Sequence, residues 1–475
     1  MESNSALTLA SFAAETTYAD LPAEVVHEVK RMLLDVIGCA LGAVSVAKGR
    51  LAIRFARETG GRAEASIIGT ADRVGMGAAT FANAELMHAL DYCPLLPPGH
   101  ITPFVTAAPL AAAEAQEASG RTLILAVAMA HEVASRIGLS LDAMRAQAGG
   151  KLGQTWGLGF NTFGAAAGVG KVIGLDAAAM NDAFGLAGYY SPVPSHNKSL
   201  NTTAGGGLSK YGPAGWIAQG GLTAARLASL GYEADRSVLD GAYGYWAMAG
   251  SKDCQFERIT AGLGEDWNVL RVLYKAWPSC GLFQSPLGAF TELIEAHGLK
   301  PEEIDRVSIL NEAQGQLPRF QTEVNNHVDS QNNLAFNIAV VAHRIRPGAR
   351  WQSDEVLGHP GIRALASKVS VEAYARAEET RKLELEVERL PYIDRRPCVV
   401  EVAARGKVLR QEAEHARWLS RRHTQFCASD ADLADKFRSN VAEVLSPQQA
   451  ERAIDKIMSL DRLASVSLPM ADLVL

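Results

Sequence analysis

The stretch Gly164-Ala165-Ala166-Ala167-Gly168-Val169-Gly170 decides the class of fold. It consists almost entirely of the smallest residues, within a segment, 162–174, that has a helical pattern. Small side chains let helix backbones approach closely, so this segment is expected to be a helix that is buried nearly all round. The chain has neither a Gly-x-Gly-x-x-Gly pattern after a strand nor a Walker pattern, so these glycines are not interpreted as a phosphate loop.

Helical patterns extend over the chain as far as about residue 265. One helix begins near Pro22 with a proline in its first turn, and Val29, Met32 and Leu33 then recur at helical spacing. Further helices are predicted at 51–58, 76–90, 105–118, 121–138, 162–174, 177–188 and 212–230.

The pattern changes after about residue 266. Alternating residues predict strands at 304–310, 369–373 and 383–387, and 398–409 has the pattern of a hairpin with Gly406 in its turn. Helices are predicted near 284–297 and 333–343, and again between 430 and 460. We therefore expect a mainly α protein, in which a large all-α domain (1–265 and 410–475) carries a smaller inserted α+β lid domain (266–409).

Length and composition place the chain among globular proteins. Its 475 residues are too many for one ordinary core, which agrees with two domains. Hydrophobic residues make up 48% and charged residues 21%, which excludes the disordered and fibrous classes. The net charge of -6 argues against a nucleic-acid or anionic-membrane partner.

Cysteine usage and the N-terminus favour a cytoplasmic location. The six cysteines are scattered without a Cys-x-x-Cys pair, which is typical of free thiols in a reducing compartment. Met1-Glu2-Ser3-Asn4-Ser5 has neither the basic nor the apolar part of a targeting signal. The longest apolar candidate for a membrane span, 123–130, ends at His131 and Glu132.

A rigid loop follows the predicted helix at 76–90. Asp91 begins it and His100 lies nine residues on, with four prolines and a glycine between 94 and 103. A carboxylate and an imidazole held in such a loop could transfer a proton. The alternative is a helix cap followed by a structural histidine.

Two lysines lie in segments that could reach a ligand. Lys210 follows the glycine-rich segment 201–209, and Lys275 lies at the expected joint between the domains, where ligand sites are common. An ammonium group can bind a carboxylate and stabilise an enolate as it forms. The alternative for each is an ordinary surface lysine. Since there is no His-x-x-x-His or His-x-x-Glu-His pattern and the carboxylates are not clustered, no metal site is predicted.

The order of several stretches resembles the MmgE/PrpD family over nearly the whole chain. The stretches are His88-Ala89-Leu90-Asp91-Tyr92, the helix at 164–170, Ser209-Lys210-Tyr211-Gly212-Pro213 and Lys275-Ala276-Trp277-Pro278-Ser279-Cys280. The family includes 2-methylcitrate dehydratase, cis-aconitate decarboxylase and iminodisuccinate epimerase. The resemblance implies a cofactor-independent enzyme, usually a homodimer, whose active site lies between a helical domain and a lid.

The resemblance also assigns site residues. Asp91, Lys210 and Lys275 fall on the family's aspartate and two lysines. Either His100 or Asp91 could be the base: His100 is the better proton carrier because imidazole titrates near neutral pH, whereas Asp91 would need desolvation to raise its pKa, or would only orient His100. The residues expected to bind substrate are Thr102, Thr155, Trp156, Tyr211, Ser279, Cys280 and Gln284.

This chain departs from the family pattern at several histidines. Thr102, Thr155 and Gln284 stand where many members have histidine, and Val340 falls roughly where members have a tyrosine. Phe104 and Trp156 add apolar surface. Such a pocket suits an apolar or ring-bearing acid better than a tricarboxylate, so neither 2-methylcitrate nor cis-aconitate is the expected substrate.

Three functions remain open from the sequence. The first is a lyase, of dehydratase or decarboxylase type, that removes a proton next to the carbonyl or carboxylate group of a small or medium carboxylic acid. The second is an isomerase or epimerase that uses the same base and the same lysines. The third is a binding or scaffold protein that has lost catalysis.

Overall fold

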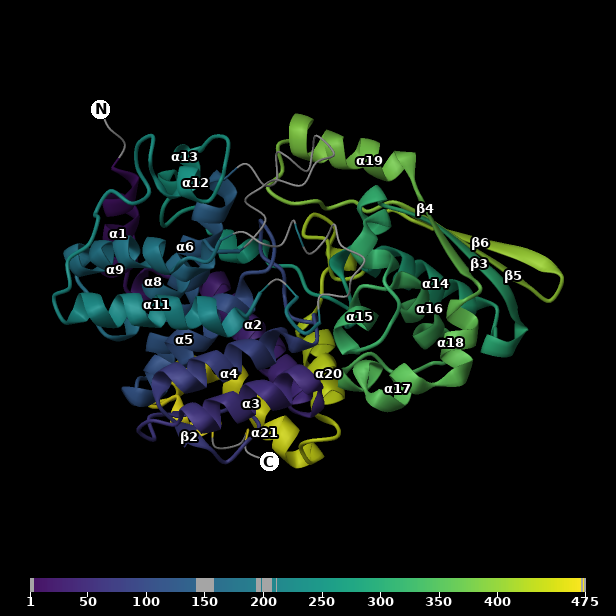
Figure 1. The fold of residues 1–475 in the computed structure, drawn as a ribbon, viewed down its shortest axis with the longest axis horizontal. Helices are drawn as coiled ribbons and strands as arrows, with labels where there is room; N and C mark the ends of the chain where they lie inside the picture. The colour runs from purple at the N-terminus through teal and green to yellow at the C-terminus, as the bar shows by residue number, and fades with distance from the viewer. Residues whose placement is uncertain are drawn as a thin grey trace.

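A computed structural model describes residues 4–141, 158–193, 198, 207–210, 212–470 and 473. Its helices outnumber its strands throughout, as the sequence predicts (Figure 1). The helices that precede residue 230 are α1 (Ser5–Glu15), α2 (Ala23–Gly42), α3 (Ala47–Thr59), α4 (Met76–Ala89), α5 (Thr102–Ala115), α6 (Gly120–Ser140), α8 (Asn161–Val172), α9 (Ala177–Tyr190) and α11 (Ala214–Ser229). The predicted helices in this part of the chain are confirmed, with ends that differ by a few residues.

Close backbone approach explains the small residues of α8. A Cβ added at Gly164 would lie 2.4 Å from the carbonyl oxygen of Ala130 in α6. A Cβ at Gly221 of α11 would lie 2.4 Å from the Cβ of Ala165 on another side of α8. Helix α8 therefore packs closely between α6 and α11, and a larger side chain at either glycine would push these helices apart. Its first ten residues are buried, as predicted.

Helix α6 is also a core helix. By length and composition it could cross a membrane, but 94% of its most apolar window is buried inside the fold. Its buried charged residues pair with each other, since Arg136 Nε donates to Glu132 Oε1 at 2.7 Å. Among the described residues, α2 and α3 pass the same test only as a pair bent by 90°.

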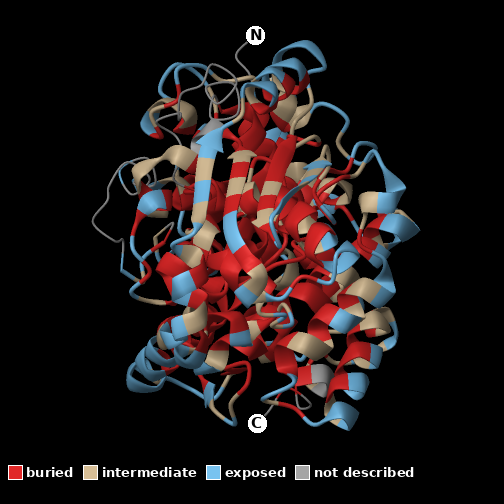
Figure 2. Ribbon diagram, turned by 90° about the vertical axis from the view of Figure 1, so that its right-hand side faces the viewer, coloured by how far each residue is buried: buried red, intermediate tan, exposed pale blue. Residues whose placement is uncertain are grey.

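A four-stranded sheet forms the centre of the other side of the molecule. Its order is β4-β3-β5-β6, with β3 parallel to β4 and the remaining pairs antiparallel. Helices α14 and α16 pack against one face, and the outer strands are largely exposed (Figure 2). The strands are β3 (Ile304–Asn311), β4 (Val369–Ala373), β5 (Cys398–Ala404) and β6 (Lys407–Ala413). The helices around them are α14 (Gln284–Ala296), α15 (His327–Gln331), α16 (Leu334–Ala342), α17 (Asp354–Gly358), α18 (Pro360–Ala366) and α19 (Ala375–Lys382).

The expectation of a strand at 383–387 was wrong. Residues Leu383–Val387 continue α19 as a π-helical turn instead of forming a strand. The Glu384 carboxylate is buried and accepts hydrogen bonds from the backbone N–H groups of Asp394 and Arg395, whereas Leu383 and Val387 are exposed. The burial of this segment is therefore the reverse of what the alternating pattern predicts for a strand. The helical part also contains a small hairpin, β1 (Ala65–Ser66) with β2 (Arg73–Val74).

The end of the chain returns to the first helices. Helices α20 (Asp430–Val441) and α21 (Pro447–Met458) pack on α2. We call α1 to α11 together with α20 and α21 the helical lobe, and α14 to β6 the sheet lobe. Short helices complete the fold: α12 (Tyr245–Met248), α13 (Glu257–Thr260) and α22 (Ser467–Met470). The exact domain boundaries, at 265 and 410, stay a prediction.

Candidate active site

Asp91 lies where α4 ends and the proline-rich loop begins. Its φ of 50° places it in the left-handed region, which aspartate tolerates better than most residues. The residue is completely buried. The loop is fastened to the segment that carries Lys275, because Leu95 and Leu273 exchange two backbone hydrogen bonds of 2.8 Å. This pairing brings Asp91 and Lys275 together although 184 positions separate them.

Both predicted lysines reach the Asp91 carboxylate. Lys210 Nζ donates to Oδ2 at 2.5 Å, and Lys275 Nζ donates to Oδ1 at 2.7 Å and to the Asp91 carbonyl oxygen at 2.7 Å. All three side chains are buried. Burial alone would raise the pKa of Asp91, but attraction to Lys210 and Lys275 outweighs it and holds that pKa well below its usual range. Asp91 is therefore ionised at neutral pH and is unsuited to act as the base.

The two ammonium groups differ from each other. Burial lowers the pKa of Lys210 despite its contact with Asp91. For Lys275, burial acts in the same direction, but attraction to Asp91 prevails and raises the pKa. Lys275 is thus the permanent cation of the pair, whereas Lys210 gives up its proton more readily.

His100 also faces the carboxylate. Its Nε2 lies 3.7 Å from Asp91 Oδ1, and its ring packs edge-on against the ring of His88 with 5.7 Å between centroids. Burial, reinforced by the charge of Lys275, lowers the pKa of His100 to about 3. The imidazole is therefore neutral at pH 7. A bound anion would offset the lysine charges and raise its pKa, which would improve its ability to accept a proton.

Amide side chains from the sheet lobe brace this cluster. Gln331, at the end of α15, accepts from Lys210 Nζ at 3.4 Å and donates to the carbonyl oxygen of Ala89 at 2.7 Å. It also donates to Gln352 Oε1 at 2.8 Å, and Gln352 donates to the carbonyl oxygen of Leu90 at 2.7 Å. Both lobes thus build the site. The role of these two amides could not be predicted from the sequence, because nothing in their local sequence distinguishes them from exposed glutamines.

Three predicted binding residues follow Lys275. Gln284 Oε1 accepts from the backbone N–H groups of Ala276 and Trp277, and its Nε2 donates to the carbonyl oxygen of Trp277. Gln284 therefore holds the turn after Lys275. Ser279 and Cys280 are buried beside it, and burial raises the pKa of the Cys280 thiol. Their contact with a substrate stays a prediction.

Two buried polar atoms near this region could serve a ligand. The hydroxyl of Thr102 and Nε2 of His327 are buried and have no hydrogen-bond partner within the described part of the chain. Burial, together with the charges of Lys48 and Arg50, lowers the pKa of His327 to about 4. His327 was not predicted, and Thr102 was. The predicted residues Thr155, Trp156 and Tyr211 lie outside the described residues.

One atom each from His88, Asp91 and His100 lies within 4.8 Å of the others, as metal ligands would. Both Asp91 oxygens already accept from an ammonium group. A divalent cation at Asp91 would stand beside two positive charges, so these residues fit a metal poorly.

Comparisons with known proteins cover both lobes. The family model of the MmgE/PrpD N-terminal domain matches residues 7–257, and that of the MmgE/PrpD C-terminal domain matches residues 277–462. The chain is 27% identical over 381 residues to a cis-aconitate decarboxylase of Aspergillus terreus, covering 74% of each chain. It is 22% identical over 472 residues to cis-aconitate decarboxylase of Homo sapiens, covering 93% of this chain and 89% of the relative.

Proposed function

Because the chain belongs to the MmgE/PrpD family, whose relatives here are carboxylic-acid lyases, we propose that it is a cofactor-independent lyase acting on a small or medium carboxylic acid. The observation that carries the proposal is the buried cluster of Asp91, Lys210 and Lys275 between the two lobes. Two ammonium groups share one carboxylate there, so the cluster has an excess positive charge that suits an anionic substrate.

Each residue of the cluster has a distinct task in this proposal. Lys275 and Lys210 bind a substrate carboxylate or carbonyl and stabilise the enolate that forms when the Cα–H or C–CO2 bond breaks. Asp91 holds both ammonium groups in position. His100 moves the proton: it accepts the proton from Cα before water departs, or, once protonated, it donates one to the enolate carbon after CO2 departs.

A substrate screen in D2O tests the proposal. The purified protein is incubated with β-hydroxy and α,β-unsaturated carboxylic acids, including aromatic ones, and the products are followed by proton NMR. Loss of water or CO2 from one class of acid supports the lyase. Deuterium incorporation without such a loss would instead indicate the isomerase that the sequence left open.

A matched pair of variants then locates the chemistry. Lys210→Met should lower kcat/KM by about 100-fold or more, the scale on which a single electrostatic contact to a developing anion acts. Lys30→Met is the control. Lys30 lies on α2 and pairs with Asp461 at 2.8 Å, and it has no contact with the cluster among the described interactions. Equal losses in both variants, or none in either, would remove Lys210 from the mechanism. A homodimer and a cytoplasmic location remain predictions.

A further inference from the structure

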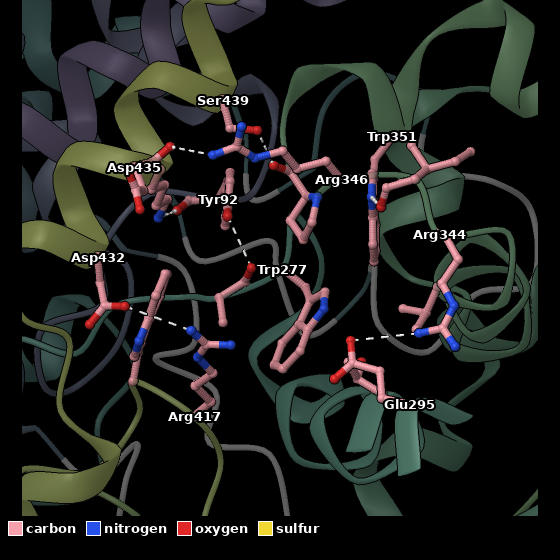
Figure 3. Close-up of a pocket in the computed structure, with 17 residues that line it drawn as sticks. Tyr92, Trp277, Glu295, Arg344, Arg346, Trp351, Arg417, Asp432, Asp435 and Ser439 are labelled. Carbon is pink, nitrogen blue, oxygen red and sulfur yellow. Dashed lines mark hydrogen bonds and ion pairs between the residues drawn. The ribbon is translucent and has the colours of Figure 1, made fainter. Parts of the chain in front are cut away.

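A cavity lies at the joint of the two lobes. Its volume is about 340 Å³, and its lining comes from α20 on one side and from α14, α16 and the loop after α16 on the other (Figure 3). Its lining includes Tyr92, which follows Asp91 in the chain, and Trp277, which lies two positions after Lys275. Asp91, His100, Lys210 and Lys275 do not line it, so it is distinct from the candidate active site.

Three arginines line this cavity from two segments that are far apart in the sequence. Arg344 lies 3.6 Å from Glu295 Oε1, and Arg417 lies 3.7 Å from Asp432 Oδ1. Arg346 donates to the carbonyl oxygen of Asp435 at 3.4 Å. These contacts are long compared with the 2.7–2.9 Å of a tight charge-assisted hydrogen bond. Arg344 Nη2 also donates to the carbonyl oxygen of Ile294 at 3.0 Å. Because a guanidinium has five N–H donors, each of the three arginines retains donors for a ligand.

The nearby carboxylates are mostly engaged elsewhere. Asp432 Oδ2 accepts from the backbone N–H and the hydroxyl of Ser429, which caps α20. Asp435 Oδ1 pairs with Arg438 at 2.6 Å. Glu295 is the partner of Arg344, but Arg346 has no ion pair within the described residues and Arg417 has only the distant Asp432. Arg346 and Arg417 are therefore incompletely neutralised, and the cavity favours an anion.

The wall between these cations is aromatic. Trp277 and Trp351 are almost completely buried and line the cavity, and Tyr92 OH donates to the carbonyl oxygen of Ala276 at 3.0 Å. Cavities of this size that combine apolar walls with a few polar groups are typical of small-molecule sites.

Backbone strain marks the same place. Arg344 has a φ of 57° and Trp418 a φ of 66°, and both residues line the cavity. The left-handed region is unfavourable for bulky residues, and such positions persist where the surrounding structure demands them, often at ligand sites. In Arg344 the strained backbone carries one of the three guanidinium groups.

We propose that this cavity binds a small organic anion, independently of the lyase reaction. A carboxylate or phosphate head group would be held by Arg344, Arg346 and Arg417, with an apolar or aromatic body against Trp277 and Trp351. Because Arg417 comes from the segment that leads into α20 whereas Arg344 and Arg346 belong to the sheet lobe, the ligand would bridge the joint.

Isothermal titration at constant ionic strength tests this site with two probes, phenyl phosphate and benzoate, which separate a phosphate from a carboxylate preference. The test variants are Arg346→Gln, Arg417→Gln and their combination, all at exposed positions. Arg54→Gln is the matched control, since Arg54 is 74% exposed on α3 and pairs only with the neighbouring Glu58 among its described contacts. Lys210→Met reports on binding in the candidate active site.

The expected result is saturable binding of at least one probe to the wild type, to Arg54→Gln and to Lys210→Met, weakened at least 10-fold by the paired Arg346 and Arg417 substitutions. The proposal is overturned if the wild type binds neither probe. It is also overturned if the double variant binds as the wild type does, or if binding is lost in Lys210→Met and kept in the arginine variants. Circular dichroism confirms that each variant is folded before titration.

Discussion

Replacing Asp91 by asparagine removes the one charge that two buried ammonium groups share. Asparagine has nearly the same shape and can still accept a hydrogen bond from Lys275. What changes is the neutralisation of Lys210 and Lys275, which donate to the carboxylate at 2.5 and 2.7 Å. Removing one partner of a buried ion pair typically costs about 3–5 kcal/mol, because the remaining charge is buried without compensation.

This free energy corresponds to a measurable shift in Tm. A chain of 475 residues, with an unfolding entropy of about 2.1 cal/mol/K per residue, has a total of about 1 kcal/mol/K. Asp91→Asn should therefore lower Tm by about 3–5 °C at pH 7. Differential scanning fluorimetry or calorimetry measures this directly. Asp461→Asn is the control, because its pair with Lys30 is partly exposed and should cost about 1 kcal/mol or less.

The pH dependence has a definite sign. The pKa of Asp91 is lowered in the folded protein, so its stabilisation is fully present above the unfolded pKa of about 4 and is lost as the pH falls further. Without the carboxylate, Lys210 and Lys275 lose the group that raises their pKa values, so both deprotonate more readily in the variant as the pH rises. The Tm difference should therefore be largest between about pH 5 and 8 and narrow on either side. A shift below 1 °C that matches Asp461→Asn across this range would refute the buried charge cluster.

Two further predictions concern the proton carrier and the helix packing. His100→Ala should slow turnover by about 100-fold. The pH profile of kcat/KM for the wild type should show no ionisation of His100 near pH 6.5, because the pKa of His100 in the free enzyme is about 3. An ionisation near pH 6.5 that disappears in His100→Ala would contradict this. Gly164→Ala should lower the free energy of unfolding by about 1–3 kcal/mol, since the new Cβ would meet the Ala130 carbonyl oxygen. Gly77 lies in α4, and a Cβ there would lie 3.7 Å from its nearest neighbour, Gln219 Nε2. Gly77→Ala should therefore stabilise the protein by up to about 1 kcal/mol. Thermal unfolding of both variants measures the two effects.

The helices could be predicted from the spacing of residues within each segment, and the family from the order of short stretches along the chain. Both signals are contained in the sequence itself. The small residues of α8 and the position of Asp91 after α4 are local signals, and the structure confirms the helices in both places. The strand predicted at 383–387 shows the limit of such signals. Its alternating pattern is compatible with a strand, but the segment forms a helical turn whose Glu384 carboxylate is buried against the backbone of Asp394 and Arg395, further along the chain.

The sequence by itself determined the helical class, the family and the candidate residues Asp91, His100, Lys210 and Lys275. Only the tertiary structure decided that one carboxylate holds both lysines, across 119 and 184 positions of chain, and that Gln331 and Gln352 brace them. It also decided that His100 is neutral and Asp91 ionised. The physical reason is that burial and charge neighbours set these properties, and both arise only when distant segments pack together.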